Sequence, residues 1–179
     1  MSTNSPFPET TPDFSDPLGL LKACHKNILN FCDQLEELSQ KIETGPIGFE
    51  IAGSAGKIYR YFKTSGKHHH DDEEINIFPI LNRTSLKLAD RVNRAKQEHT
   101  HQDELWAILA PQLANPISIK DGTEFSATAR EFIESQRAHV KFEEEELFEM
   151  AQHLIGQAEL EKIGRKMAER RGVAYRPKL

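Results

Sequence analysis

Apolar residues recur at helical spacing from Leu18 onward. Asp16 and Pro17 supply a helix cap and a proline suited to a first turn, and Gly45-Pro46 ends the pattern. Between them, every third or fourth position carries an apolar side chain or a histidine: Leu18, Leu21, His25, Ile28, Cys32, Leu35, Leu38 and Ile42. This spacing predicts a first helix over about residues 17–44.

The same period returns in three further long segments. We expect the second helix over about 49–81, weakened by three glycines and bent or restarted at Pro79. The third runs over about 85–113, and the fourth over about 123–155, where Gly156 stops it. A shorter amphipathic segment between residue 160 and Gly172 predicts a fifth helix.

No segment alternates apolar and polar residues with the period of a strand, so the chain is predicted to be all-α. Its simplest architecture is an antiparallel up-down-up-down four-helix bundle with an additional short C-terminal helix. We expect a flexible leader at 1–15, the bundle at 16–155, and the C-terminal helix and tail at 156–179.

Composition narrows the functional classes. The 179 residues carry a net charge of −5 without a basic stripe, so nucleic acid is not an expected partner. No run approaches the roughly 18 apolar residues of a membrane span, and residues 1–6 lack the features of a secretory signal. We therefore expect a cytoplasmic protein. Cys24 and Cys32 are separated by about 12 Å of helical rise, so they should remain reduced thiols.

A pattern that occurs twice carries the candidate chemistry. His69 is followed four residues later by Glu73 and nine residues later by a phenylalanine, and His139 is followed in the same way by Glu143 and a phenylalanine. Positions four apart share one face of a helix, with Cβ atoms about 5–6 Å apart. Each copy can therefore present an imidazole and a carboxylate to one point.

The first and third helices each add a histidine to their apolar stripe. His25 lies in the first, and His99 lies in the third, while His101 is rotated by about 200° and faces elsewhere. Taken singly, a core histidine, a solvated histidine run and a charged glutamate face are the simpler interpretations. Taken together, four histidines that fall within about 11 Å along the bundle axis favour a shared metal, which removes the cost of burying them.

These residues resemble the hemerythrin-like HHE cation-binding domain over about residues 16–155. The matching features are a histidine on the first helix, His-x-x-x-Glu before a Phe-Pro on the second, Glu98-His99 on the third, and His-x-x-x-Glu on the fourth. The resemblance implies a non-haem di-iron centre in which Glu73 and Glu143 bridge two irons that the histidines cap.

The chain departs from the oxygen-carrying hemerythrins at two positions. Those proteins have a further histidine where this chain has Asp103, and an aspartate five residues after the last histidine where this chain has Glu143 at four. His70, Asp103 or solvent can complete the ligand set, and the sequence leaves these alternatives open.

Imidazole and carboxylate suit iron, with zinc or manganese as less favoured occupants. Four histidines and two bridging glutamates leave at least one position open on two six-coordinate irons, so we expect O₂, NO or peroxide as the ligand. No Ser-His-Asp, Cys-His, phosphate-binding or dinucleotide motif appears, which favours ligand binding over conventional catalysis. Glu98-x-x-His101 alone is too little for a ferritin-like centre.

Two other functions remain open from the sequence. One is a structural or interaction module in which a single metal ties the helices together and partners dock around Ile163 and Met167. The other is a di-iron enzyme that uses O₂ or peroxide. Both a monomer and a homodimer are compatible with the chain.

Overall fold

The computed structural model describes residues 12–176, and no β-strand occurs among them. The prediction of an all-α protein is therefore confirmed for this range. Most of the predicted leader and the last three residues of the predicted tail lie outside the described residues. The first helix, α1, spans Pro17–Thr44, and the Asp16 carboxylate accepts a hydrogen bond of 3.0 Å from the Gly19 N–H, as its role as a cap requires.

The second predicted helix is a continuous but irregular helical segment. It comprises α2 (Phe49–Tyr61), the π-helical turn η1 (Phe62–Gly66), α3 (Lys67–Asp72), a second π-helical turn η2 (Glu73–Ile77) and α4 (Phe78–Thr84). Pro79 stands in the first turn of α4, where its missing N–H does not interrupt a regular α-helix.

The remaining segments follow the predicted order. Helix α5 spans Leu86–Ala114, a 3₁₀ turn η3 spans Pro116–Ser118, and α6 spans Gly122–Phe142. A third π-helical turn, η4 (Glu143–Phe148), leads into α7 (Glu149–Leu154), and α8 (Gln157–Arg170) follows. The side chains of Ser85 and Asp121 cap α5 and α6 by accepting hydrogen bonds from N–H groups of the first turn.

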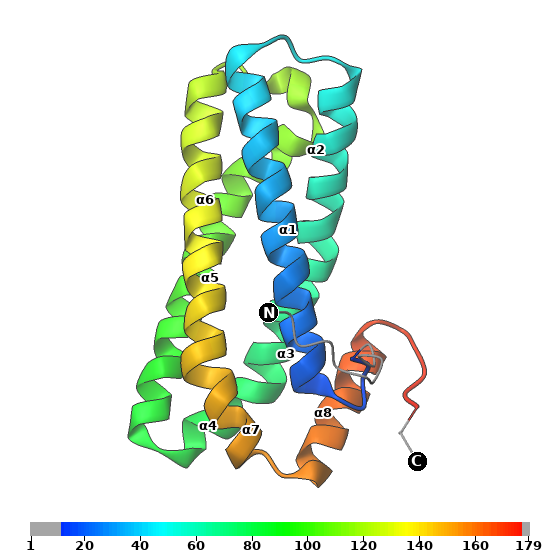
Figure 1. Cartoon of the computed structure of the whole chain (residues 1–179), viewed down its shortest axis with the longest axis vertical. Coiled ribbons are helices and arrows are strands. Elements are labelled where there is room, and N and C mark those ends of the chain that lie inside the picture. Colours follow the sequence, from blue (N-terminus) through cyan, green and yellow to red (C-terminus); the bar gives the residue numbers. More distant parts are fainter. Residues whose placement is uncertain (1–11, 177–179) are drawn as a thin grey trace, which may run out of the picture.

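The long helices lie side by side (Figure 1), with α1 packed against α2 and α6, and α5 packed against the same two helices. Helix α8 packs across the end where α1 begins and contacts α1 and α3. Gly122 at the start of α6 allows a close approach to α1, because a Cβ atom there would lie 2.8 Å from the Ile42 carbonyl oxygen. These contacts enclose one interior between the helices.

The interior contains two apolar clusters with a polar layer between them. On α1, His25 stands between Leu21, which belongs to one cluster, and Ile28, which belongs to the other. On α5, His99 stands in the same way between Ala95 and Leu105. The fold therefore places buried histidines at a common level.

Helix α8 corrects one expectation about partners. Ile163 is 3% exposed and Met167 is fully buried, and both belong to the apolar cluster nearer to α8. They pack inward because the amphipathic face of α8 covers the end of the helical array. A partner cannot dock on these two side chains while α8 stays in place.

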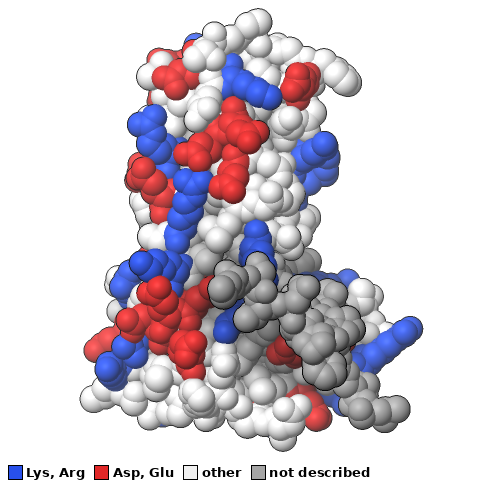
Figure 2. Space-filling model, viewed as in Figure 1, with Lys and Arg blue, Asp and Glu red and all other residues white. Residues whose placement is uncertain are grey.

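The outer surface mixes charges of both signs. Figure 2 shows acidic and basic side chains interspersed over the face that carries α1 and α6, without a large patch of one sign. Between these helices Arg137 donates to Asp33 and Glu36 at 2.7 and 2.8 Å. Among the described helices, none is both long and apolar enough to cross a bilayer.

Candidate metal centre

Six of the seven predicted ligands form one buried cluster in the polar layer. Each of them is at most 1% exposed, and the helical segments α1, α3 with η2, α5 and α6 with η4 all contribute. We call them the six-residue cluster: His25, His69, Glu73, His99, His139 and Glu143.

The ligand atoms of the cluster fall into two groups, each within a 4.8 Å span. Both groups contain Glu73 and Glu143, and they differ in their histidines: His25 and His69 in one, His99 and His139 in the other. Two neighbouring cations would therefore share the two glutamates, and each would have two imidazoles of its own.

The distances within the cluster suit metal coordination. The Oε1 atom of Glu73 lies 3.2 Å from Nε2 of His69, and its Oε2 atom lies 3.4 Å from Nε2 of His99. The Oε2 atom of Glu143 lies 3.2 Å from Nε2 of His25. Two atoms bound at right angles to one ion at about 2.1 Å are about 3 Å apart. The four imidazoles and two carboxylates thus fit a pair of cations without rearrangement of the helices.

Three carboxylates outside the cluster hold three of its histidines, and we call them the outer carboxylates. The distances to Nδ1 are 3.0 Å from Glu144 to His25, 2.7 Å from Glu74 to His99 and 2.8 Å from Glu98 to His139. A carboxylate that accepts the Nδ1 proton of an imidazole fixes its tautomer and leaves Nε2 as the metal-binding atom. In each case Nε2 points into the cluster.

His99 and His139 show the consequence of this arrangement. Their Nε2 atoms are 2.9 Å apart, and each ring already has a carboxylate for its Nδ1 proton. In the neutral tautomer that this pairing selects, two lone pairs would face each other, which is unfavourable unless a proton or a cation lies between them.

His69 lacks even this support. Neither of its ring nitrogens has a hydrogen-bond partner, and the same holds for both oxygens of Glu73 and for Oε1 of Glu143. Unpaired buried polar atoms are costly, so a cluster of them in a packed interior calls for a compensating ligand. A pair of cations would compensate the Nε2 atom of His69 and the carboxylate oxygens of both glutamates together.

Burial and neighbouring charges act differently on the two glutamates. Burial and the negative charge of Glu143 together hold the pKa of Glu73 well above its usual value. Burial acts on Glu143 too, but His139 and His25 outweigh it and lower the pKa of Glu143. Burial, with the charge of His25, also holds the pKa of His69 well below its usual value, so that imidazole is neutral and its lone pair is free to bind a metal.

His25 is the exception among the histidines. Burial disfavours its charged form, but the hydrogen bond and charge of Glu143, with further help from Glu73 and Glu144, raise its pKa above the usual value. A cation at this point must displace that proton, because only the neutral imidazole has a lone pair to donate.

Both repeated motifs pass directly into π-helical turns. Glu73 is the first residue of η2 and Glu143 the first of η4. Such turns occur often at functional sites, where they re-aim side chains. The phenylalanines at the ends of the motifs pack against two histidines of the cluster. The distance between ring centroids is 5.2 Å for Phe148 and His25, which are stacked, and 5.7 Å for Phe78 and His99.

Comparison with known proteins decides the family. The model of the hemerythrin HHE cation binding domain matches residues 16–151. The chain belongs to this family. It is also 28% identical over 166 residues to an uncharacterized protein of Haemophilus influenzae, an alignment that covers 93% of this chain and 96% of that protein.

The seventh predicted ligand, His70, lies beside the cluster of this HHE domain. Its ring stacks on that of His99 at 3.8 Å, and it forms a third group of ligand atoms with His99 and His139. Asp103 belongs to none of the groups found among the described residues. Of the alternatives that the sequence left open, the geometry thus brings His70 to the cluster.

Two of the outer carboxylates, Glu74 and Glu144, are functional candidates that the sequence analysis did not single out, and it named Glu98 only as part of two sequence motifs. Glu74 and Glu144 each follow a glutamate of the cluster, and Glu98 precedes a histidine of it. The signal was present as adjacent glutamates, but in sequence such a run is typical of a solvated helix face.

Asp72 is a further residue that the sequence analysis did not single out. It is fully buried beside Glu73, and it accepts hydrogen bonds from Arg170 and, at 2.7 Å, from Arg171. Arg170 also donates to Asn76 at 3.1 Å. The C-terminal end of α8 is thereby tied to the turn that carries Glu73.

Proposed function

We propose that this HHE domain is a cytoplasmic non-haem di-iron protein that binds O₂ or NO, or handles iron under redox stress. Its scaffold in this proposal is an antiparallel four-helix bundle with α8 added outside. The observation that carries it is the sharing of Glu73 and Glu143 by two groups of histidines. One cation would use one group and leave the other with unpaired buried atoms.

The number and type of donors support iron. A structural zinc takes four ligands in a tetrahedron, whereas iron commonly takes more. Four histidines and two bridging glutamates fill about eight of the twelve positions on two six-coordinate cations, and His70 offers one more. Open positions remain, and a ferrous pair with such positions supplies the capacity to bind O₂ or NO. Zinc and manganese are the other candidates.

The protein's own residues prepare this site. The outer carboxylates hold three imidazoles with Nε2 turned inward, so little reorganisation accompanies metal binding. Phe78 and Phe148 cover the cluster on two sides and limit the entry of water. A small uncharged diatomic ligand suits such a site better than a charged substrate does.

The proposal is tested by iron analysis and optical spectra of the purified protein under air, under nitrogen and with NO. We expect about two irons per chain and a visible absorption that changes with each gas. A colourless protein that retains one zinc per chain contradicts the proposal and favours the single-metal structural module.

A di-iron enzyme is the second candidate, and one observation favours it. A cavity of about 110 Å³ adjoins His70, which is larger than a diatomic ligand requires. Sustained consumption of O₂ or peroxide with an added reductant, beyond one equivalent per centre, would identify an enzyme. A single stoichiometric reaction would identify a binding protein.

A further inference from the structure

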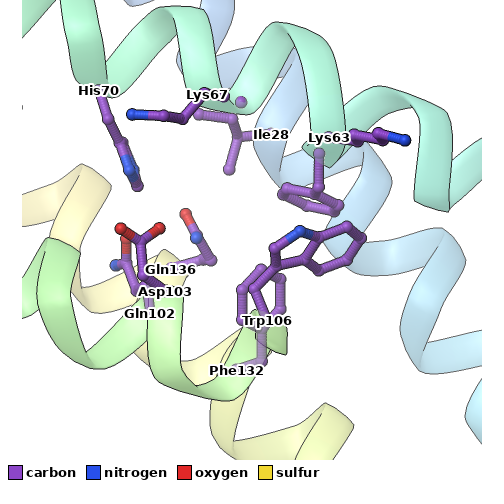
Figure 3. A pocket seen from close by; sticks show the side chains of 11 residues that line it. Ile28, Lys63, Lys67, His70, Gln102, Asp103, Trp106, Phe132 and Gln136 are labelled. Atoms are coloured by element: carbon purple, nitrogen blue, oxygen red, sulfur yellow. The ribbon is translucent and has the colours of Figure 1, made fainter. Parts of the chain in front are cut away.

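The cavity beside His70 is lined by both polar and aromatic side chains. It lies between the α2–α3 segment, α5 and α6, and Figure 3 shows His70 and the two glutamines at one end and Trp106 and Phe132 at the other. The polar end also contains Asp103, and Lys63 lies beside the aromatic end. This division suits a molecule that has one polar and one apolar end.

Two buried amide groups at the polar end lack partners for their oxygens. Gln102 is 1% exposed and Gln136 is 3% exposed, and neither Oε1 atom has a hydrogen-bond partner. The Nε2 of Gln102 donates to the Ser135 carbonyl at 3.4 Å, which leaves its oxygen for another group. Buried acceptors without donors favour a ligand that brings an N–H or O–H group.

The opposite end offers flat apolar surfaces. Phe62, Trp106 and Phe132 pack against one another, with ring centroids 5.1 to 5.9 Å apart. Aromatic rings prefer offset or edge-to-face contacts over this range of distances. A six-membered ring can therefore extend the cluster without displacing any of its members.

The two lysines that line the cavity are already engaged, and the third charged lining residue, Asp103, is exposed and lies within the electrostatic influence of Lys67. Lys67 donates to Asp71 at 2.6 Å, and Lys63 donates to the Tyr59 hydroxyl at 3.0 Å. An anionic ligand would have to compete for these lysines and would be repelled by Asp103, and a cationic ligand would have to compete with Lys67 for Asp103. A neutral ligand meets neither cost.

We propose that the cavity binds a small neutral aromatic alcohol of the phenol class. The ring lies against Trp106 and Phe132, and the hydroxyl donates to the Oε1 of Gln102 or Gln136. A cavity of about 110 Å³ that opens to the surface is comparable to the roughly 150 Å³ apolar cavities that hold benzene in other proteins. The inference goes beyond the proposed function and does not depend on the metal.

The chain provides its own reporter for this binding. Trp106 is the only tryptophan, and it lines the cavity, so its fluorescence responds to an occupant directly. Phenol is titrated into the protein as purified and into chelator-treated protein, with excitation at a wavelength that phenol does not absorb, and benzene is the comparison ligand. We expect saturable binding in both preparations, with phenol bound about 5- to 10-fold more tightly than benzene.

Variants of the two amides test the polar end. In Gln136→Leu and in Gln102→Leu, phenol should lose most of its advantage over benzene, because Leu keeps a similar volume without an acceptor. Gln112→Leu, on α5 outside the cavity, should leave both affinities unchanged. Circular dichroism verifies that each variant is folded.

Three results would overturn the inference. One is the absence of any saturable change, which would mean that water alone occupies the cavity. Another is equal affinity for phenol and benzene in the unaltered protein, a result that needs no variant to fold. The third is a preference for phenol that survives both substitutions. Because the titration is repeated without metal, its failure is distinguishable from failure of the di-iron proposal.

Discussion

The two His-x-x-x-Glu motifs have the same spacing but stand in different surroundings. His139 is held by Glu98 through Nδ1, whereas neither nitrogen of His69 has a hydrogen-bond partner. The residue before Glu73 is the buried Asp72, and the residue before Glu143 is a phenylalanine. A shared local pattern thus gives each motif the same ligand atoms and different support.

The difference reaches the carboxylates themselves. Burial and its neighbour Glu143 raise the pKa of Glu73, whereas nearby imidazoles overcome burial and lower the pKa of Glu143. In the metal-free protein the directions of these two shifts place the proton of the coupled pair toward Glu73. The spacing of a motif determines which side chains can bind one cation, and the packed environment determines their protonation.

Removing either glutamate should have the largest effect, because both belong to both groups of ligands. We expect Glu73→Ala and Glu143→Ala each to lower the metal content from about two cations per chain to below one. Glu145→Ala, an exposed position in η4, is the control. Metal analysis after dialysis provides the measurement, and retention of both cations by Glu73→Ala would show that the two motifs are not equivalent as ligands.

Replacing each glutamate by glutamine should affect the stability of the metal-free protein differently in the two motifs. Glu143→Gln removes a buried charge from its imidazole partners and should lower the free energy of unfolding by about 2–4 kcal/mol. The amide in Glu73→Gln resembles a protonated carboxyl group, so this substitution should change the free energy of unfolding by less than about 1 kcal/mol. Urea unfolding with a chelator at pH 7 measures both, and equal losses would contradict the assigned protonation.

The support of His139 by Glu98 has no counterpart at His69. Glu98→Gln removes the charged acceptor of the Nδ1 proton and should weaken metal binding about 10- to 100-fold. Competition with a chelator measures this affinity. Glu104→Gln, exposed on the same helix, should leave it unchanged, and an unchanged affinity in Glu98→Gln would remove Glu98 from the account.

The tie between Asp72 and α8 should contribute least. Asp72→Asn weakens the pairing with Arg170 and Arg171, which are partly exposed and can regain water, so we expect a loss of about 1–2 kcal/mol in unfolding free energy. Asp71→Asn breaks an exposed pair with Lys67 and should cost less than about 1 kcal/mol. Thermal unfolding compares the two, and equal shifts would contradict the role of Asp72.

The sequence predicts well what one helix determines by itself. The cap at Asp16 and the i,i+4 pairing of His69 with Glu73 follow from local geometry, and the structure has both. The inward choice of His99 over His101 also follows, since His101 is exposed and pairs with Glu131. Periodicity fixes which face of a helix turns inward.

The contacts between different helices could not be predicted in this way, because they depend on how the helices face one another. That Glu98 meets His139, or that Glu144 meets His25, requires the relative rotation of two helices, which no single periodic stripe contains. The inward packing of Met167 needs α8 to be placed across the end of α1. The three π-helical turns have no signal that the sequence analysis used, and two of them, η2 and η4, change where the side chains after Glu73 and Glu143 point.

The central claim is that Glu73 and Glu143 are shared by two cations. Anomalous diffraction at the iron edge from crystals of the aerobically purified protein tests it directly. We predict two peaks about 3.5–4 Å apart, one beside His25 and His69 and the other beside His99 and His139, with both glutamates between them. A single peak bound by one group of histidines, with the other group unligated, would contradict the account.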